Sequence, residues 1–322
     1  LHYPLRRQRQ MCIRDRYLLR IIISYGVRTA SILSLMLATT QVWQIGGPFD
    51  LTQIPPQTGL FFLIAAGLRL GVFPLNLPFL QEPSLRRGAG NIIRLAPVAT
   101  SLCLLARLPS DLLPLGLMQW SPLFQGLLAI AALYAALRWL QAEDEIAGRP
   151  FWIVAWSSLA MSSVLNGAPA ASLAWGTALI LPGSLLFLYY PRIQRMNFLL
   201  HFGLIGLIGL PFTPLASGWA GLTASGFTVW TLFFTLTHAL MVLGYLNRAL
   251  QPGGAAGALE SWARLVYPLG LIIIIQSNIM LGLIGWPGSL TLGGWWLSLI
   301  SIFLVLATVY LSRRLGIQSP YI

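Results

Sequence analysis

Long apolar segments, separated by Gly, Pro and charged residues, recur along the whole of this chain. The hydrocarbon core of a bilayer is about 30 Å thick, and a helix needs about 20 apolar residues to cross it. Division of the sequence at its turn residues gives about ten such segments, which are residues 18–43, 58–80, 91–108, 120–139, 151–166, 171–190, 198–216, 222–246, 265–285 and 294–312. The sequence therefore predicts an all-α, polytopic membrane protein with about ten transmembrane helices.

The composition supports this class and excludes an ordinary soluble domain. Charged residues make up 9% of the chain and hydrophobic residues 57%, whereas soluble domains contain about 25% charged residues. All 20 basic residues are arginine, and the formal net charge is +12. Because these arginines are spread over the loops, they indicate membrane topology and not a nucleic-acid-binding surface.

The arginines also predict an orientation. If the ten segments alternate strictly, only Arg107 lies on one side, and the other side holds Arg86, Arg87, Arg138, Arg149, Arg192, Arg195, Arg248, Arg264, Arg313 and Arg314. Cytoplasmic loops carry such an excess, so we expect both ends of the chain to be cytoplasmic, in the cell inner (plasma) membrane. An interfacial aromatic belt is expected near the arginine-poor ends, at Trp43, Trp120, Trp219, Trp286, Trp295 and Trp296.

The first 17 residues differ from the rest of the chain. They are rich in arginine, begin with Leu and contain MCIRDR, which resembles a translated sequencing adapter. We expect residues 1–17 to be a non-native or disordered tail, and residues 18–322 to be a transmembrane domain that lacks its amino-terminal part.

The segment from Leu60 to Leu80 contains Arg69 at its middle, followed by Gly71, Pro74 and Pro78. Proline removes a backbone donor and clashes with the preceding turn, so Pro74 is expected to break or kink this helix. A buried cation at a broken helix suggests a transport site, with Arg69 organising a hydrated path. The alternative is structural, because Arg69 could bind the carbonyls opened by the break or extend its side chain to the interface.

A second interrupted segment, residues 198–216, contains Gly209, Pro211 and Pro214. It lies five segments after the first, so the two run in opposite directions. Paired interrupted helices of opposite orientation are typical of the inverted repeats of secondary transporters.

Several motifs resemble the antiporter-like membrane subunits of respiratory complex I (NADH:quinone oxidoreductase), membrane-bound hydrogenases and Mrp-type cation/proton antiporters. Arg69, Pro74 and Asn76 stand at the spacing at which this family has lysine, proline and often histidine on its first broken helix. The motifs at the other positions are Ala155-Trp156-Ser157-Ser158, Gly209-Leu210-Pro211, Ser217-Gly218-Trp219, Gly244-Tyr245 and Arg248.

The resemblance implies proton or cation translocation within a multi-subunit complex. Partner membrane subunits would then surround this chain, and in complex I other subunits hold flavin and iron–sulfur clusters. This chain contains no cofactor or metal motif, since Cys12 and Cys103 form no CxxC, and it would have no redox centre of its own.

The chain also departs from the family at the positions that carry protons. The family relays protons through lysine, histidine and glutamate, whereas apolar or small residues, among them Ala99, Thr100 and Leu222, stand at several of these positions. Arginine stays protonated, so Arg69 would be a poor proton carrier. Arg94, near a family histidine position, is expected to reach the interface with its side chain.

Two histidines are further candidates for an ion path. His201 and His238 could carry protons because histidine titrates near neutrality, although a hydrogen-bonded histidine between helices is the commoner situation. Glu143, Asp144 and Glu145, with Arg138 and Arg149, are expected to form a solvated cytoplasmic loop.

Three functions follow from these observations. The first is a membrane subunit of a proton- or cation-translocating assembly, with ion-path residues Arg69, Pro74, Asn76, Arg94, His201, Pro211 and His238. The second is a structural paralogue that packs in such a complex and conducts nothing, which the absence of lysine favours. The third is a secondary transporter of an anionic solute, with Arg69 as its counter-charge. The expected partners are other membrane subunits and the lipid bilayer, with no nucleic acid.

Overall fold

The computed structural model describes residues 3–47, 50–75, 79, 87–188, 197–250, 263–284 and 294–314. These residues form helices and connecting turns and contain no strand, so the all-α prediction is confirmed for this part of the chain. The helices in order are α1 (Tyr3–Gln44), η1 (Leu51–Gln53), α2 (Pro56–Leu70), α3 (Arg87–Ala106), α4 (Leu115–Met118), α5 (Ser121–Gln141), α6 (Glu145–Leu165), α7 (Ala171–Leu188), α8 (Asn197–Leu207), α9 (Pro214–Leu222), α10 (Val229–Leu250), α11 (Ala263–Ile284) and α12 (Trp295–Arg314).

The described helices are those of a membrane-embedded protein. Six of them are long and apolar enough to cross a bilayer, namely Leu18–Gln44, Gly88–Ala106, Ser121–Gln141, Ala171–Leu188, Val229–Leu250 and Trp295–Arg314. Helices α2, α8 and α9 are shorter, α6 is more polar, and the apolar part of α11 covers only Pro268–Ile284. The expected count of about ten spans is therefore not confirmed.

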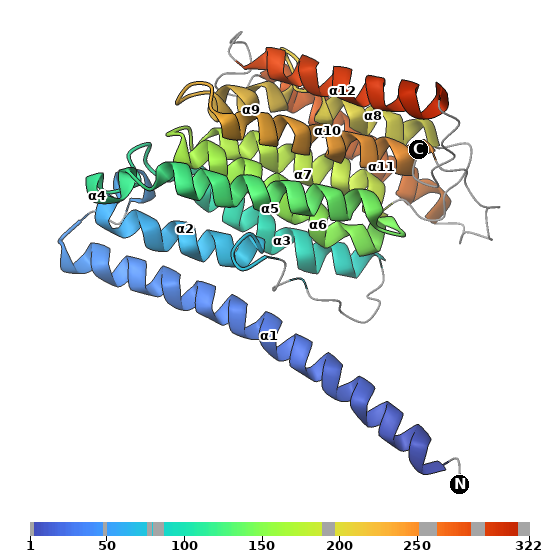
Figure 1. Ribbon diagram of the computed structural model, residues 1–322, viewed down its shortest axis with the longest axis horizontal. Coiled ribbons are helices and arrows are strands. Elements are labelled where there is room, and N and C mark those ends of the chain that lie inside the picture. Colours follow the sequence, from blue (N-terminus) through green and yellow to red (C-terminus); the bar gives the residue numbers. More distant parts are fainter. Residues whose placement is uncertain are drawn as a thin grey trace.

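Helix α6 lies at the centre of the bundle. It packs against α5, α7, α3, α9 and α10, and every residue from Trp152 to Val164 is buried. Figure 1 shows α5, α6 and α7 side by side, with α9, α10 and α12 beyond them. A helix that is buried all round belongs to the core of a large bundle, so α6 is the framework around which the others pack.

Glycine allows the bulky aromatic side chains to fit between these helices. A Cβ atom on Gly244 would lie 2.4 Å from Trp139 Nε1, and one on Gly218 would lie 2.8 Å from the ring of Trp175. Small residues let helices approach closely in a membrane. Each indole therefore fills the space that a glycine on a neighbouring helix leaves open.

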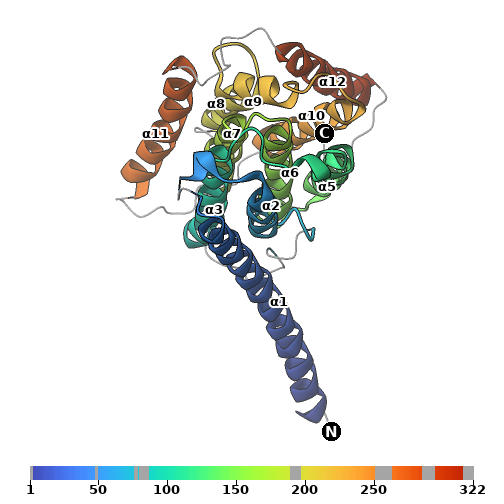
Figure 2. The ribbon, with the colours of Figure 1, turned by 90° about the vertical axis from the view of Figure 1, so that its left-hand side faces the viewer.

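Helix α1 stands at the edge of the molecule, and its amino-terminal half projects beyond the bundle (Figures 1 and 2). It packs along α2, where Ser31 Oγ donates to the carbonyl of Ala65 (2.7 Å) and Ser34 Oγ donates to that of Phe61 (3.2 Å). Residues 3–17 continue this helix. The boundary expected after residue 17 has no test in the fold and stays a prediction.

The loop between α5 and α6 differs from the solvated cluster expected there. Asp144 caps α6 by accepting a hydrogen bond from Ala147 N (2.6 Å), and Glu145 and Arg149 are buried. Arg149 donates to Asn91 Oδ1 on α3. The prediction of a solvated loop was wrong for Glu145 and Arg149, because α6 begins inside the bundle and its first turn packs against α3.

Arg248, near the end of α10, is a buried cap for the carboxyl end of α5. Its guanidinium donates to the carbonyls of Trp139 (2.6 Å), Ala142 (3.1 Å) and Gly244 (2.9 Å). Its Cζ lies 3.8 Å from the centroid of the Trp139 ring. The last carbonyls of a helix have no hydrogen-bond partner within the helix and carry partial negative charge. A cation there supplies hydrogen-bond donors to these carbonyls and offsets their charge.

Candidate functional site

The interruption between α8 and α9 is the most elaborate irregular backbone among the described residues. Helix α8 ends at Leu207, and α9 begins at Pro214. The Thr213 hydroxyl donates to the carbonyls of Ile208 and Leu210, both at 2.7 Å. Gly209 N donates to Ser298 Oγ of α12 (3.0 Å). Side chains thus hydrogen-bond to backbone groups that have no helical partner at the break. Such bonds are required in a membrane, where water is not there to satisfy these groups.

His238 of α10 lies fully buried beside this interruption. Its Nε2 is 2.9 Å from the carbonyl oxygen of Leu207, the last residue of α8, and its Nδ1 is 2.6 Å from Ser301 Oγ of α12. A carbonyl only accepts, so Nε2 carries a proton. The Ser301 hydroxyl can donate to a neutral Nδ1 or accept from a protonated one, so both contacts persist in either charge state of the ring.

Aromatic rings surround His238. The ring centroids of Trp219, Trp156 and Trp175 lie 5.0, 5.6 and 6.3 Å from that of His238. Nε1 of Trp156 and Nε1 of Trp219 are buried and make no hydrogen bond within the described part of the chain. Two unused donors therefore remain in contact with the histidine site.

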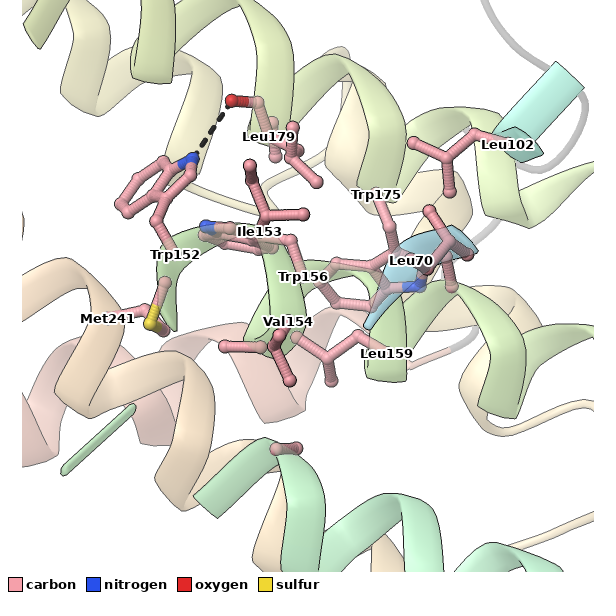
Figure 3. Close-up of a cluster of buried hydrophobic side chains, with 14 of the residues drawn as sticks. Leu70, Leu102, Trp152, Ile153, Val154, Trp156, Leu159, Trp175, Leu179 and Met241 are labelled. Atoms are coloured by element: carbon pink, nitrogen blue, oxygen red, sulfur yellow. Dashed lines mark hydrogen bonds between the residues drawn. The ribbon is translucent and has the colours of Figure 1, made fainter. Parts of the chain in front are cut away.

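These rings belong to a longer row of indoles, which we call the tryptophan row: Trp139, Trp152, Trp156, Trp175 and Trp219. Successive ring centroids are 5.1, 5.5, 5.8 and 5.4 Å apart. Figure 3 shows Trp152 and Trp156 on α6 and Trp175 on α7, with the Trp152 indole bonded to the carbonyl of Leu179 (2.9 Å). Five large apolar rings thus fill the middle of the bundle.

Trp219 corrects one expectation from the sequence. It was predicted to lie in an interfacial belt, but its side chain is fully buried on α9. Trp43, Trp120 and Trp296 are exposed, as a belt would require. The prediction failed for Trp219 because the interruption turns α9 into the bundle core, which the position of a residue along the chain does not reveal.

Arg69 lies next to the last residue of α2. Helix α2 ends at Leu70, and Gly71 adopts a left-handed conformation with a φ of 71°. The chain therefore leaves the helix at a glycine, three residues before the proline expected to break it. Pro74 is exposed in the turn that follows. Asn76 lies outside the described residues.

The other predicted site residues do not gather at one place. Arg94 is buried on α3 and not extended to solvent, whereas His201 is exposed on α8. Pro211 is half-buried in the interruption near His238. Of the six candidates that the structure describes, His238 and Pro211 lie at the α8–α9 interruption, and Arg69 and Pro74 lie at the end of α2. The described residues contain no cluster of three His, Cys, Asp or Glu that could hold a metal ion.

Sequence reasoning missed the two serine hydroxyls that bind at the interruption between α8 and α9. Ser298 and Ser301 on α12 look like ordinary serines of an apolar helix, yet both are buried against the break. Their spacing of three residues puts them on one helix face, which is the only sign of this role in the sequence.

Sequence reasoning also missed an amide network at the far end of α9. Asn166 Nδ2 donates to the carbonyl of Leu222 (2.8 Å), and its Oδ1 accepts from Gln125 Nε2 and Ser225 Oγ, both at 2.9 Å. Gln125 also accepts from the Ser162 hydroxyl (2.5 Å). The network ties the carboxyl end of α9 to α5 and α6.

Replacement of Asn166 with alanine should lower the free energy of unfolding by about 1–3 kcal/mol, because it leaves the Leu222 carbonyl and the Gln125 amide without this partner. Reversible unfolding in bicelles measures this loss. Ser225→Ala, which removes only one exposed contact of the same network, should change the stability by less than about 0.5 kcal/mol. Equal losses in the two variants would contradict the role of Asn166.

Comparisons with protein-family models, curated proteins and solved structures found no match for this chain. The likeness to antiporter-like subunits therefore depends on the sequence motifs alone and stays a prediction.

Proposed function

We propose that the protein is a membrane subunit of a proton- or cation-translocating assembly, in which the α8–α9 interruption and His238 form the polar centre of the path. The observation that carries this proposal is the pair of contacts of His238, to the carbonyl at the end of α8 and to Ser301. A titratable ring at an interrupted helix can hold a proton on Nε2 while Nδ1 exchanges one with a hydroxyl.

The surroundings of His238 support this proposal. The unused indole N–H groups of Trp156 and Trp219 are donors beside the ring, and buried donors of this kind favour a bound water. Chains of water and hydroxyl groups carry protons, so Ser301 and these donors are suitable neighbours for a relay histidine.

The same proposal includes the number, arrangement and orientation of the membrane spans. The end of α2 at Gly71 and the gap between α8 and α9 are two interruptions, which is consistent with an inverted repeat of about ten spans. Partner membrane subunits would complete the path, with any flavin and iron–sulfur clusters in other subunits. The arginine-rich loops would face the cytoplasm of a cell with this protein in its inner membrane.

The test is proton flux into proteoliposomes that hold the protein with its native membrane partners. His238→Gln keeps a hydrogen-bond donor but cannot be protonated, and we expect it to lower the flux by about tenfold or more. Ser301→Ala should lower it less, whereas Ser277→Ala, which removes an exposed hydroxyl on α11, should leave it unchanged. Equal flux in wild type and His238→Gln would contradict the proposal.

A second function is favoured by the tryptophan row. Its five fully buried rings fill the middle of the bundle with apolar surface, and the hydrogen bonds of His238 lead to a hydroxyl and a carbonyl but to no second ionisable side chain among the described residues. The protein would then be a structural subunit that conducts nothing. Wild-type flux no greater than that of empty liposomes, with assembly intact, would support this function.

A further inference from the structure

Two arginines lie level with each other at the seam between α1 and α2. The bonds from Ser31 to the Ala65 carbonyl and from Ser34 to the Phe61 carbonyl set an antiparallel register between these helices. One turn further along the seam, the register brings Arg28 of α1 level with Arg69 of α2.

Both side chains lie on the faces with which these helices pack. Arg69 follows the buried residues Phe62 and Ala65 at intervals of seven and four, and Arg28 lies four residues after Ser24 and three before Ser31, both buried. Each arginine is half-buried. The two cations therefore lie on the faces of α1 and α2 that form one seam.

Within the part of the chain that the structure describes, neither guanidinium has a partner that offsets its charge. Among the described residues, Arg28 and Arg69 make no hydrogen bond or ion pair, and residues 18–47 and 56–75 contain no acidic side chain. Asp50 lies at the opposite end of α2, beside η1. Two like charges in a region of low dielectric repel each other, so an anion between them would stabilise the pair.

The depth of the pair indicates where this anion comes from. Helix α2 has 15 residues and is about 22 Å long, which is less than the hydrocarbon thickness of about 30 Å. A helix of this length that begins at one membrane surface brings Arg69, at its other end, to within about 10 Å of the opposite surface. An arginine side chain extends from there to the head groups of that leaflet, which is the leaflet expected to hold the arginine-rich loops.

We propose that Arg28 and Arg69 together bind the phosphate of an anionic phospholipid in that leaflet, at the seam between α1 and α2. Guanidinium groups bind phosphate oxygens through paired, charge-assisted hydrogen bonds, which a point charge does not reproduce. The lipid phosphate takes the place of a protein carboxylate and covers the turn where α2 ends. This site is separate from His238 and does not depend on proton conduction.

The test is native mass spectrometry of the purified protein titrated with phosphatidylglycerol or with phosphatidylcholine. We expect wild type to bind phosphatidylglycerol more tightly, and Arg28→Gln/Arg69→Gln to weaken its binding by about thirtyfold, since the charge-assisted bonds of two guanidinium groups to one phosphate are lost. The matched control is Arg313→Gln/Arg314→Gln, which removes two exposed arginines at the end of α12 and should keep wild-type affinity.

Arg28→Lys/Arg69→Lys keeps both charges and should restore part of the affinity, which a purely structural role would not predict. Inorganic phosphate at millimolar concentration should not displace the lipid. Equal weakening in the two Gln double variants, equal affinity for the two lipids, or displacement by phosphate would overturn the proposal. If the Arg28→Gln/Arg69→Gln protein does not fold, the single variants are titrated, and unchanged affinity in both would also overturn it.

Discussion

Arg248→Ala should lower the free energy of unfolding by about 3–5 kcal/mol. The substitution removes charge-assisted bonds to three carbonyls and a cation stacked on the Trp139 ring at 3.8 Å. Each such bond contributes about 1.5–3 kcal/mol, and the carbonyls at the end of α5 would remain buried without this donor. Reversible unfolding in bicelles, followed by far-ultraviolet circular dichroism, measures the loss.

Two variants separate the geometry of this cap from its charge. Arg248→Lys keeps the charge, but a single ammonium group cannot reach all the carbonyls, so an intermediate loss is expected. Arg138→Ala removes an exposed arginine of α5 whose Cζ lies 5.4 Å from the Phe151 ring, and it should cost less than about 1 kcal/mol. A loss in Arg138→Ala as large as that in Arg248→Ala would show that Arg248 has no special role.

Gly221→Ala should separate α7 from α9. A Cβ at this position would lie 2.2 Å from Ala171 Cβ, and neither atom can move without its backbone. Overpacking of this kind costs about 1–3 kcal/mol or more. The expected result is a lower free energy of unfolding together with changed environments of Trp175 and Trp219, which near-ultraviolet circular dichroism reports.

The matched control for Gly221→Ala is Gly270→Ala, also a helical glycine. A Cβ there would have no atom within 4 Å, so the change should stabilise α11 by about 0.5–1 kcal/mol through its better helix propensity. If both alanine variants were equally destabilised, the close approach of α7 and α9 at Gly221 would not be the cause.

Apolar segments and turn residues in the sequence correctly predicted that the described part of the chain is helical, but not the number of spans. The apolar length of each segment predicts a helix, and the Gly and Pro residues around Gly209 and Pro214 mark where backbone hydrogen bonding must stop. The end of α2 was expected at Pro74 but occurs at Gly71, because a left-handed glycine closes the last turn before the proline is reached.

The candidate site could be predicted only in part. His238 was recognisable as a titratable residue in an apolar helix, but its partners come from α8 and α12, which lie far from it along the chain. Likewise, the burial of Arg149 and Arg248 depends on which helix ends meet. Local pattern carries no information on such contacts, since they are set by packing between distant segments.

The tryptophan row also has an optical consequence. Indole rings with centroids 5.1–5.8 Å apart are close enough for excitation to pass from one to the next, so their ultraviolet emission is a collective signal. A quencher that reaches any one of these rings should dim several of them together. The intrinsic fluorescence of the bundle core would then report the loosening of α6, α7 and α9 as a single event.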